Sequence, residues 1–342
     1  MKKIIIAVLA VAAMVACSKE QTVVAPKGDA IGFSTFVDNA TRATDITTGN
    51  LEEFGVYASI ENTSGAALIL SNAKFYLNSD NAWTYDNTQY WVPKAMYEFI
   101  AFAPYTGAKW AYAPSTTADE GVVTFDNKTA AADQDFIFAA ADMDLTNTTA
   151  LTASPGVVNF TFAHQLSKVA FKFNNDFAAE NNITLRVYNV NVAGLVSKAT
   201  ATVADGDADG ETDAGEWTKT ADSDTFARTF GTQVAANAEN TATIIAAKSN
   251  IVTDYHYFIP VADTQYTVTF DVDIFQAGVM IDTYHHTVNT KPTLAKGGNY
   301  LFTTTLNASN VSDDPTQQLY PIEFNVNNVN GWDPANGNVD VK

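Results

Sequence analysis

Cysteine is almost absent from the sequence, because Cys17 is the only one in 342 residues. A single thiol cannot form a disulfide within the chain. Its position near the start of the chain also makes it a poor core residue or catalytic nucleophile. Its neighbours in the sequence indicate a different role.

Basic residues are scarce as well. The chain has 19 Lys and Arg against 38 Asp and Glu, which gives a formal net charge of −19. A field of this sign repels the phosphates of nucleic acids and the headgroups of anionic lipids. We therefore expect no nucleic acid partner, and no basic patch that would hold the protein to a membrane.

Long apolar runs are missing after the first residues, so no transmembrane helix is expected. The apolar run at residues 4–16 follows Lys2 and Lys3 and is too short to span a bilayer. A basic start, an apolar run and small residues before Cys17 together indicate a secretory signal peptide over residues 1–16.

The end of this signal, Met14-Val15-Ala16-Cys17, resembles a bacterial lipobox, although Met14 replaces the usual Leu. In a lipobox, signal peptidase cuts before the cysteine and the thiol carries diacylglycerol. We therefore predict lipidation at Cys17, since two or more acyl chains give stable anchoring. An ordinary secreted protein with a leftover thiol is the alternative.

The rest of the chain is divided by composition and length. Residues 17–29 are polar and contain Pro26 and Gly28, which predicts a flexible tether. The length that remains suggests two domains. A junction near residues 162–167, where one strand-like run ends and another begins, gives domains over residues 30–164 and 165–342.

Short runs of β-branched and aromatic residues recur along both domains, separated by Asn, Asp, Gly and Thr. In the first run, residues 30–37, Ile31, Phe33 and Val37 share one face. The pattern predicts an all-β protein of antiparallel sandwiches without a long amphipathic helix. Residues 193–241 are acidic and loop-like. The further predicted strands are 54–60, 74–77, 97–104, 121–125, 135–140, 157–163, 168–173, 183–190, 241–247, 255–262, 265–275, 280–288, 300–307 and 322–329.

Several segments, taken in order, resemble Bacteroidales fimbrillin-family lipoproteins over nearly the whole chain. Each motif alone is weak, but their order and spacing are fairly specific. The resemblance implies two tandem transthyretin-like antiparallel β-sandwich domains, in a shaft or accessory (tip) subunit of a cell-surface fimbria that supports adhesion. The segments are the lipobox near residue 17, ATRAT (40–44), LEEFGVYA (51–58), YWVPKAMYEFIAFAPY (90–105), FAHQLSKVAFKF (162–173) and GGNYLFTTTLN (297–307).

The resemblance also implies a pathway. Such precursors are exported as lipoproteins to the outer membrane and cell surface, lose their first strand to an Arg- or Lys-specific protease, and polymerise into extracellular fimbriae when another subunit fills the groove. The implied partners are other fimbrial subunits, the export machinery, the protease, and host or bacterial surface ligands. The choice between shaft, tip and anchor subunit stays open at this point.

Arg42 is the only basic residue between Lys27 and Lys74, and it lies in a polar stretch rich in Thr, Asn and Asp. It is thus an isolated target for a trypsin-like protease in the kind of loop where cleavage concentrates. Together with the resemblance, this predicts a cut between Arg42 and Ala43 that removes the strand over residues 30–37. An ordinary solvated loop arginine is the alternative.

The C-terminal segment, residues 319–341, is a candidate donor strand. Ile322, Phe324 and Val326 form one apolar face with period two, as expected of a strand that pairs with a sheet edge and fills alternate pockets. A strand that closes its own domain would have the same pattern.

Residues 205–216, DGDADGETDAGE, match the pattern D-x-D-x-D-G-x5-E. Calcium takes about six to eight oxygen ligands, which such a loop can supply. The flanks favour strand or loop rather than helix, so a solvated acidic loop is the alternative. No other cofactor is required. The candidate ligands are Asp205, Asp207, Asp209, Glu211, Asp213 and Glu216.

Enzymatic activity has no support in the sequence. It has no G-x-S-x-G elbow, P-loop or H-E-x-x-H motif, and its four histidines lack a metal-binding spacing. His285 and His286 are adjacent in a predicted strand, so they point to opposite faces and cannot share one ion. We therefore expect that the protein is not an enzyme.

Aromatic residues are dense between residues 90 and 112. Exposed rings could stack on sugars, in which case the protein would be a monomeric surface lipoprotein that binds glycans or calcium. Rings packed in a sandwich core are the other explanation. Trp91 and Trp110 lie near turn residues, so their exposure distinguishes the two.

Overall fold

The computed structural model describes residues 30–37, 45–80, 82–131, 133–151, 155–205, 212–231, 244–314, 318 and 320–328. Within these ranges the regular structure is β-strand, apart from one 3-10 turn at Ala179–Asn181. The expected all-β class is therefore confirmed. No helix in this part of the chain is long and apolar enough to cross a membrane. The signal peptide, the tether with Cys17, and the pair Arg42 and Ala43 lie outside the described residues.

The first sheet has seven strands in the order β1-β9-β8-β5-β2-β3-β4. Its central strand β5 is buried on both faces: Phe99 faces one hydrophobic core, and Ile100 faces another. The sheet curls until its two edge strands, β1 and β4, touch. The bounds are β1 (Gly32–Val37), β2 (Glu53–Asn62), β3 (Gly65–Leu77), β4 (Trp83–Tyr85), β5 (Met96–Ala103), β8 (Ile137–Asp144) and β9 (Val157–His164).

A second sheet packs on the outer face of the first and has the order β13-β12-β7-β6, with β14 paired to β12. In β12, Ala199, Ala201 and Val203 face this shared core. The small size of these residues makes the alternation a weak hydrophobic signal, which explains why the expectation of a loop over residues 193–241 was wrong here. The bounds are β6 (Trp110–Pro114), β7 (Gly121–Asp126), β12 (Lys198–Asp205), β13 (Thr212–Ala214) and β14 (Thr218–Lys219).

The later part of the chain forms a sandwich of two further sheets around one core. Their orders are β17-β10-β21-β22, with β18 on β10, and β15-β11-β19-β20, with β16 on β11. The bounds are β10 (Ser167–Asn175), β11 (Ile183–Val196), β15 (Thr225–Phe230), β16 (Ile244–Ile245), β17 (Asn250–Val252), β18 (His256–Phe258), β19 (Tyr266–Gln276), β20 (Val279–Thr290), β21 (Asn299–Leu306) and β22 (Asn325–Asn328).

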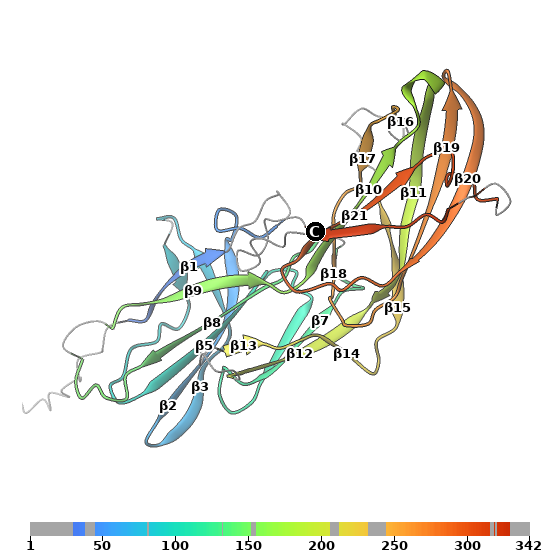
Figure 1. Cartoon of the computed structure of the whole chain (residues 1–342). Helices are drawn as coiled ribbons and strands as arrows, with labels where there is room; N and C mark the ends of the chain where they lie inside the picture. The colour runs from blue at the N-terminus through green and yellow to red at the C-terminus, as the bar shows by residue number, and fades with distance from the viewer. Residues whose placement is uncertain are drawn as a thin grey trace, which may run out of the picture.

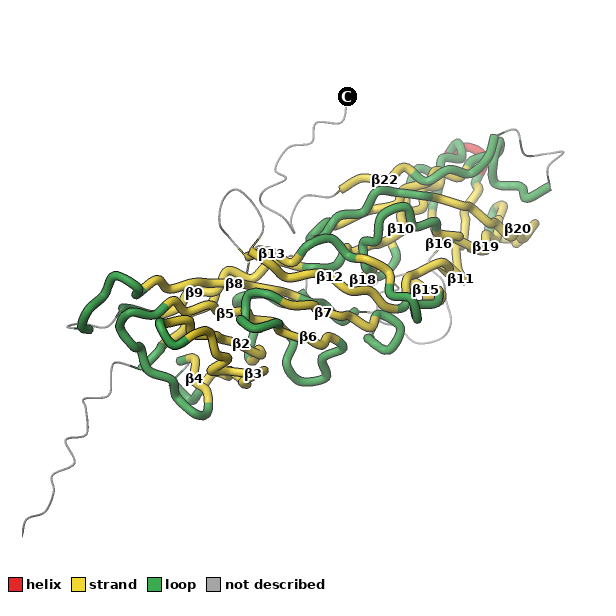
Figure 2. The backbone as a smooth tube through the Cα atoms, turned by 90° about the horizontal axis from the view of Figure 1, so that it is seen from below, coloured by secondary structure: helices red, strands yellow, loops and turns green. Residues whose placement is uncertain are grey.

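The molecule is elongated, with the two sandwiches end to end (Figures 1 and 2). The β2–β3 turn lies at one far end, at the lower left of Figure 1, and the β19–β20 turn lies at the other, at the upper right. β9 and β10 belong to different sheets, yet β12 pairs with β7 across the expected boundary at residue 164. The division into residues 30–164 and 165–342 stays a prediction. The pairing of β12 with β7 joins strands from the two sides of this boundary.

Two strand pairs are parallel, which corrects the expected antiparallel pairing at these two places only. β1 runs parallel to β9, and β10 runs parallel to β21. In both pairs the partners are far apart in the sequence, so long connections allow the parallel direction. Periodicity reports which face of a strand is buried, and it carries no information on the direction of the neighbouring strand.

Candidate functional site

The first strand lies at an edge of its sheet and is held on both sides. Gly32–Val37 pairs in parallel with residues 157–162 of β9. On the other side, the Ile31 backbone N–H donates to the Gln89 carbonyl at 3.0 Å, and Ala30 forms an isolated bridge with Tyr90. β1 therefore occupies a groove between β9 and the segment that follows β4.

The floor of this groove is aromatic. Ile31 and Phe33 are buried, and the Phe33 ring packs edge-on against Phe75 with 4.6 Å between ring centroids. The side chain of Val37 lies outside the described part. Burial of large apolar side chains contributes roughly 1.5–3 kcal/mol each, so an empty groove would leave an apolar floor in water. The other rings around Phe33 are Tyr85 at 5.5 Å, Phe99 at 5.7 Å and Phe160 at 5.8 Å.

Tyr85 also contributes a polar contact at the groove. Its hydroxyl donates to the Ile31 carbonyl at 3.3 Å and accepts from the Gln89 backbone N–H at 3.0 Å. Burial raises the pKa of the Tyr85 hydroxyl. The group therefore keeps its proton at neutral pH and stays a hydrogen-bond donor to a strand in the groove.

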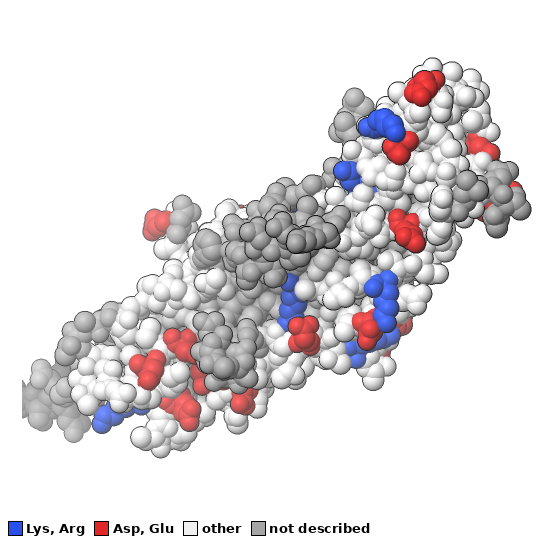
Figure 3. Space-filling model, viewed as in Figure 1, with Lys and Arg blue, Asp and Glu red and all other residues white. Residues whose placement is uncertain are grey.

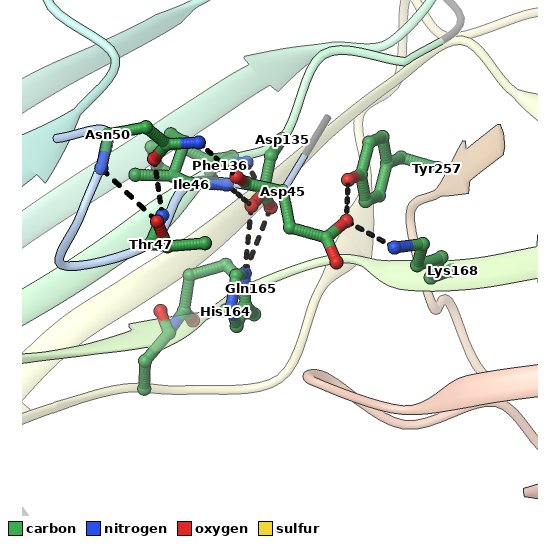
Figure 4. A network of polar contacts seen from close by, with 11 residues as sticks. Asp45, Ile46, Thr47, Asn50, Asp135, Phe136, His164, Gln165, Lys168 and Tyr257 are labelled. Carbon is green, nitrogen blue, oxygen red and sulfur yellow. Dashed lines mark hydrogen bonds and ion pairs between the residues drawn. The ribbon is translucent and has the colours of Figure 1, made fainter. Parts of the chain in front are cut away.

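Beyond β1, the described chain resumes at Asp45, whose carboxylate is fully buried (Figure 4). Lys168 of β10 forms an ion pair with Asp45 Oδ1, and the Tyr257 hydroxyl of β18 donates to the same oxygen at 2.5 Å. Both partners belong to the later sandwich. The chain three residues after Arg42 is therefore anchored to a different part of the molecule from β1.

A second buried pair lies beside this ion pair (Figure 4). The Ile46 backbone N–H donates to Asp135 Oδ2 at 2.9 Å, and His164 Nδ1 lies 2.9 Å from the same oxygen. Asp135 precedes β8, and His164 ends β9. Together with Asp45, these contacts fix residues 45 and 46 where the two sandwiches meet.

The candidate donor residues pack into their own domain in this structure. β22 pairs with β21 at a sheet edge, and Ile322 is buried. The Phe324 ring lies 5.4 Å from Phe171 and 6.0 Å from Phe173, measured between ring centroids. Val326 also packs on this core. This position is the one expected of a strand that closes its own domain.

The candidate calcium ligands are only partly described. Asp207, Asp209 and Glu211 lie outside the described residues, as do the side chains of Asp205 and Asp213. The backbone pairs β12 with β13, so strands flank the segment as the sequence indicated. Glu216 is exposed. Among the side chains that the structure describes, no group of three His, Cys, Asp or Glu could hold a metal ion. The calcium site stays a prediction.

The two tryptophans that test the glycan interpretation are both buried: Trp91 is 2% exposed and Trp110 is 9% exposed. Trp110 Nε1 donates to the Pro104 carbonyl at 2.7 Å. Both rings are core residues, so they offer no platform for a sugar. His286 is buried and the side chain of His285 is exposed, which confirms that they point to opposite faces.

The sequence interpretation missed Asp45, Lys168 and Tyr257. One signal was present: Lys168 lies within an apolar strand, SKVAFKF, where a buried lysine needs a buried acid. The sequence could not identify which acid, because Asp45 is 123 residues away.

A known family resembles this chain in sequence, and a known fimbrial protein resembles it in fold. The model of a family described as fimbrillin-like matches residues 41–328. A fimbrial protein from Bacteroides vulgatus is 16% identical, with a TM-score of 0.57 over 89% of this chain and 99% of that chain. This likeness shows a shared fold. No curated protein matches significantly.

Two other solved structures are similar at lower scores. A putative cell adhesion protein from Bacteroides ovatus is 16% identical over 89% of this chain and 98% of that chain, with a TM-score of 0.48. The fimbrial anchor protein Mfa2 from Porphyromonas gingivalis is 11% identical over the same shares, with a TM-score of 0.41.

Proposed function

This chain belongs to the fimbrillin-like family, and we propose that it is a structural subunit of a cell-surface fimbria, in the shaft or as an accessory or tip pilin. In this proposal the precursor is exported as a lipoprotein, anchored to the outer membrane through Cys17, and assembled by strand exchange after proteolysis. The observation that carries the proposal is β1, an edge strand that fills an aromatic groove and precedes the segment containing Arg42.

A cut after Arg42 would leave β1 held by noncovalent contacts alone. Each of its hydrogen bonds contributes a net of roughly 0.5–1.5 kcal/mol, and Ile31 and Phe33 add their burial. A strand with the same pattern can therefore replace β1. The Asp45 anchor supports this proposal further, because it would hold the new N-terminus while β1 leaves.

The C-terminal segment carries the matching pattern. Ile31, directly before β1, and Phe33 in β1 are two residues apart, and so are Ile322 and Phe324. In the proposed exchange, Ile322 of one copy takes the place of Ile31 in the next, and Phe324 takes the place of Phe33. In this exchange Phe324 leaves the aromatic pocket of its own domain and enters that of the next copy. The two pockets are alike, so the exchange proceeds because the cut opens an acceptor groove.

The cleavage is tested on surface filaments. In the wild type, the polymerised subunit should begin at Ala43, whereas Arg42→Ala should accumulate as a lipidated monomer. Lys27→Ala removes a basic residue from the same region and should polymerise normally. N-terminal sequencing decides between the outcomes: filaments whose subunits still begin at Cys17 would show that strand removal is not the switch.

The donor segment is tested by deleting residues 320–342. The truncated protein should be secreted and cleaved but should not form filaments, and its thermal unfolding shows whether the second sandwich still folds. Phe324→Asp in the full chain is a second test, because a charge cannot enter the aromatic groove. Normal filaments from either folded variant would rule out donation by this segment.

The proposal has two further parts: adhesion of the fimbria to host or bacterial surface ligands, and binding of calcium by residues 205–216. Calcium is supported by the letter-for-letter match of the loop pattern. Calorimetric titration should give binding heat for the wild type and none for Asp205→Ala. Absence of heat from the wild type at millimolar calcium would remove this ligand.

A further inference from the structure

The β19–β20 turn presents large apolar side chains to solvent. Val279 is 66% exposed, Met280 54% and Ile281 54%. Consecutive side chains in a strand point to opposite faces, so these exposed residues lie on both faces of the hairpin. The tip of the hairpin therefore extends beyond the packed part of the sheet. The sequence has no charged residue from Ile274 to Ile281. Clustered exposed apolar residues of this kind mark interaction sites.

The opposite end of the molecule carries a similar turn. Residues 62–73, around the β2–β3 turn, contain no charge. Ala66 and Ala67 are exposed, and Leu68 is 40% exposed. On the face shown in Figure 3, the end formed by this turn, at the lower left, is white, with acidic and basic groups next to it. In a chain of net charge −19, whose surface repels a second copy, two uncharged turns are the favoured contact surfaces, and each has one exposed acid beside it, Glu61 and Asp282.

The strand registers show which end of the groove faces the β2–β3 turn. Glu61, next to that turn, pairs with Met96, and Met96 pairs with Asp144 at the end of β8. β9 is antiparallel to β8 and so begins at the same end, and Gly32 pairs with the first residue of β9. A strand that replaces β1 in the same direction therefore enters the groove from the β2–β3 end.

The donor segment leaves its own molecule near the other end. The His285 backbone N–H donates to Asp313 Oδ2 at 2.9 Å, so the chain before residue 315 runs beside β20, four residues from Ile281. A copy that receives this segment must lie beyond the β19–β20 tip. The two ends then face each other between successive copies.

We propose that the β19–β20 tip (Val279, Met280, Ile281) of one copy packs against the β2–β3 tip (Ala66, Ala67, Leu68) of the next copy in the fimbria. The contact rests on the proposed strand exchange and adds a second interface to it. It joins different surfaces of identical chains, so it is heterologous and propagates into an open filament rather than a closed ring.

The test is polymerisation of trypsin-cleaved protein, followed by sedimentation and electron microscopy. Met280→Asp places a charge in the contact and should raise the concentration for half-maximal polymerisation by about tenfold or more. Val122→Asp is the matched control, because Val122 is 41% exposed in β7, outside both tips, and the variant should polymerise like the wild type. Equal polymerisation of the wild type and Met280→Asp would overturn the contact.

A charge-reversal pair tests the partner surface. Leu68→Lys in the same chain as Met280→Asp places opposite charges on the two tips and should restore much of the lost polymerisation at low salt. No recovery in the double variant would show that the two tips do not meet. Separately, strand exchange is followed by binding of a synthetic peptide of residues 319–330 to the cleaved Met280→Asp monomer. If this peptide fails to bind even the cleaved wild type, the proposed exchange fails and the tip contact falls with it.

Discussion

At the scale of single residues, the most constrained group is the buried pair of Asp45 and Lys168. Both side chains are essentially inaccessible to water, and Tyr257 donates to the same carboxylate oxygen as Lys168. A buried ion pair adds little net stability compared with apolar residues of the same size, but removal of one partner leaves an uncompensated charge. The pair thus makes the structure intolerant of single substitutions at either position.

Lys168→Met should therefore destabilise the protein by roughly 3–5 kcal/mol, measured by chemical denaturation. The double variant Asp45→Asn with Lys168→Met should recover much of this loss because it removes both charges. Lys128→Met breaks an exposed pair with Asp224 and should change the stability little. A loss in Lys168→Met no larger than that in Lys128→Met would contradict the role of the pair.

Glu98 gives a second residue-scale prediction, for pH dependence. Burial raises its pKa from 4.5 to about 7, although Ser59 donates a hydrogen bond to it, and Asp119 and Asp142 add to the increase. The folded state thus prefers the protonated acid. The stability that protonated Glu98 contributes is fully present below the pKa that this residue has in the unfolded chain. It is lost as pH rises through about 7, the pKa of Glu98 in the folded state.

Glu98→Gln removes this titration. We expect the melting temperature of the variant to exceed that of the wild type at about pH 8 and to lose this advantage near pH 5. Asp144→Asn, at an exposed carboxyl whose pKa is lowered by Thr146, serves as a control with the opposite sign. Parallel pH profiles for the wild type and Glu98→Gln would show that Glu98 does not titrate in this range.

At the scale of elements, β1 and β22 are edge strands, and Phe33 in β1 and Phe324 directly before β22 each lie in an aromatic pocket. Phe33 lies among Phe75, Tyr85, Phe99 and Phe160, and Phe324 lies over Phe171 and Phe173. Edge strands present unpaired backbone groups, which proteins usually protect. Here the edges carry the residues that the proposed exchange requires.

Phe33→Ala should weaken the binding of β1 in its groove, on which the proposed exchange depends. In the uncut chain the loss of stability should be about 3–5 kcal/mol, and after trypsin cleavage β1 should be released faster from the variant than from the wild type, as followed by size exclusion. Ser34→Ala removes only an exposed hydrogen bond to Asn159 and should release β1 at the wild-type rate. Release of β1 from cleaved Phe33→Ala no faster than from the wild type would mean that the ring is not its anchor.

At the scale of the whole molecule, the protein is elongated and strongly acidic, and we propose that it is joined to its surroundings at its ends. Its two sandwiches lie end to end (Figure 1), and the formal net charge is −19. Repulsion between such surfaces opposes contact between copies. Anchoring and assembly are therefore expected to depend on local features: the lipid on Cys17, the groove of β1, and the uncharged tips.

Replacement of Cys17 tests the anchor. Cys17→Ala should move the protein from the membrane fraction to the soluble fraction and abolish labelling with radioactive palmitate, because the acidic remainder offers no basic patch to bind lipid. Ser18→Ala, at the next residue, should leave both unchanged. Continued labelling of Cys17→Ala would disprove lipidation at this cysteine.

The all-β class, the positions of most strands and the buried face of clearly alternating strands follow from the sequence alone. The reason is local: alternation of apolar and polar residues directly reflects the two faces of a strand. It worked for β9, where Val158, Phe160 and Phe162 are buried as alternation predicts. It was weak for β12, whose inward residues Ala199 and Ala201 are small.

The neighbours of each strand, in contrast, depend on how the whole chain folds. The parallel pairing of β1 with β9, the crossing of β12 to β7, and the meeting of Asp45 with Lys168 all join segments far apart in the chain. Each depends on the packing of whole sheets, since a periodic pattern fits any edge of suitable register. The sequence therefore identified β1 as a strand, while its groove and the buried anchor behind it arise from contacts that no local pattern encodes.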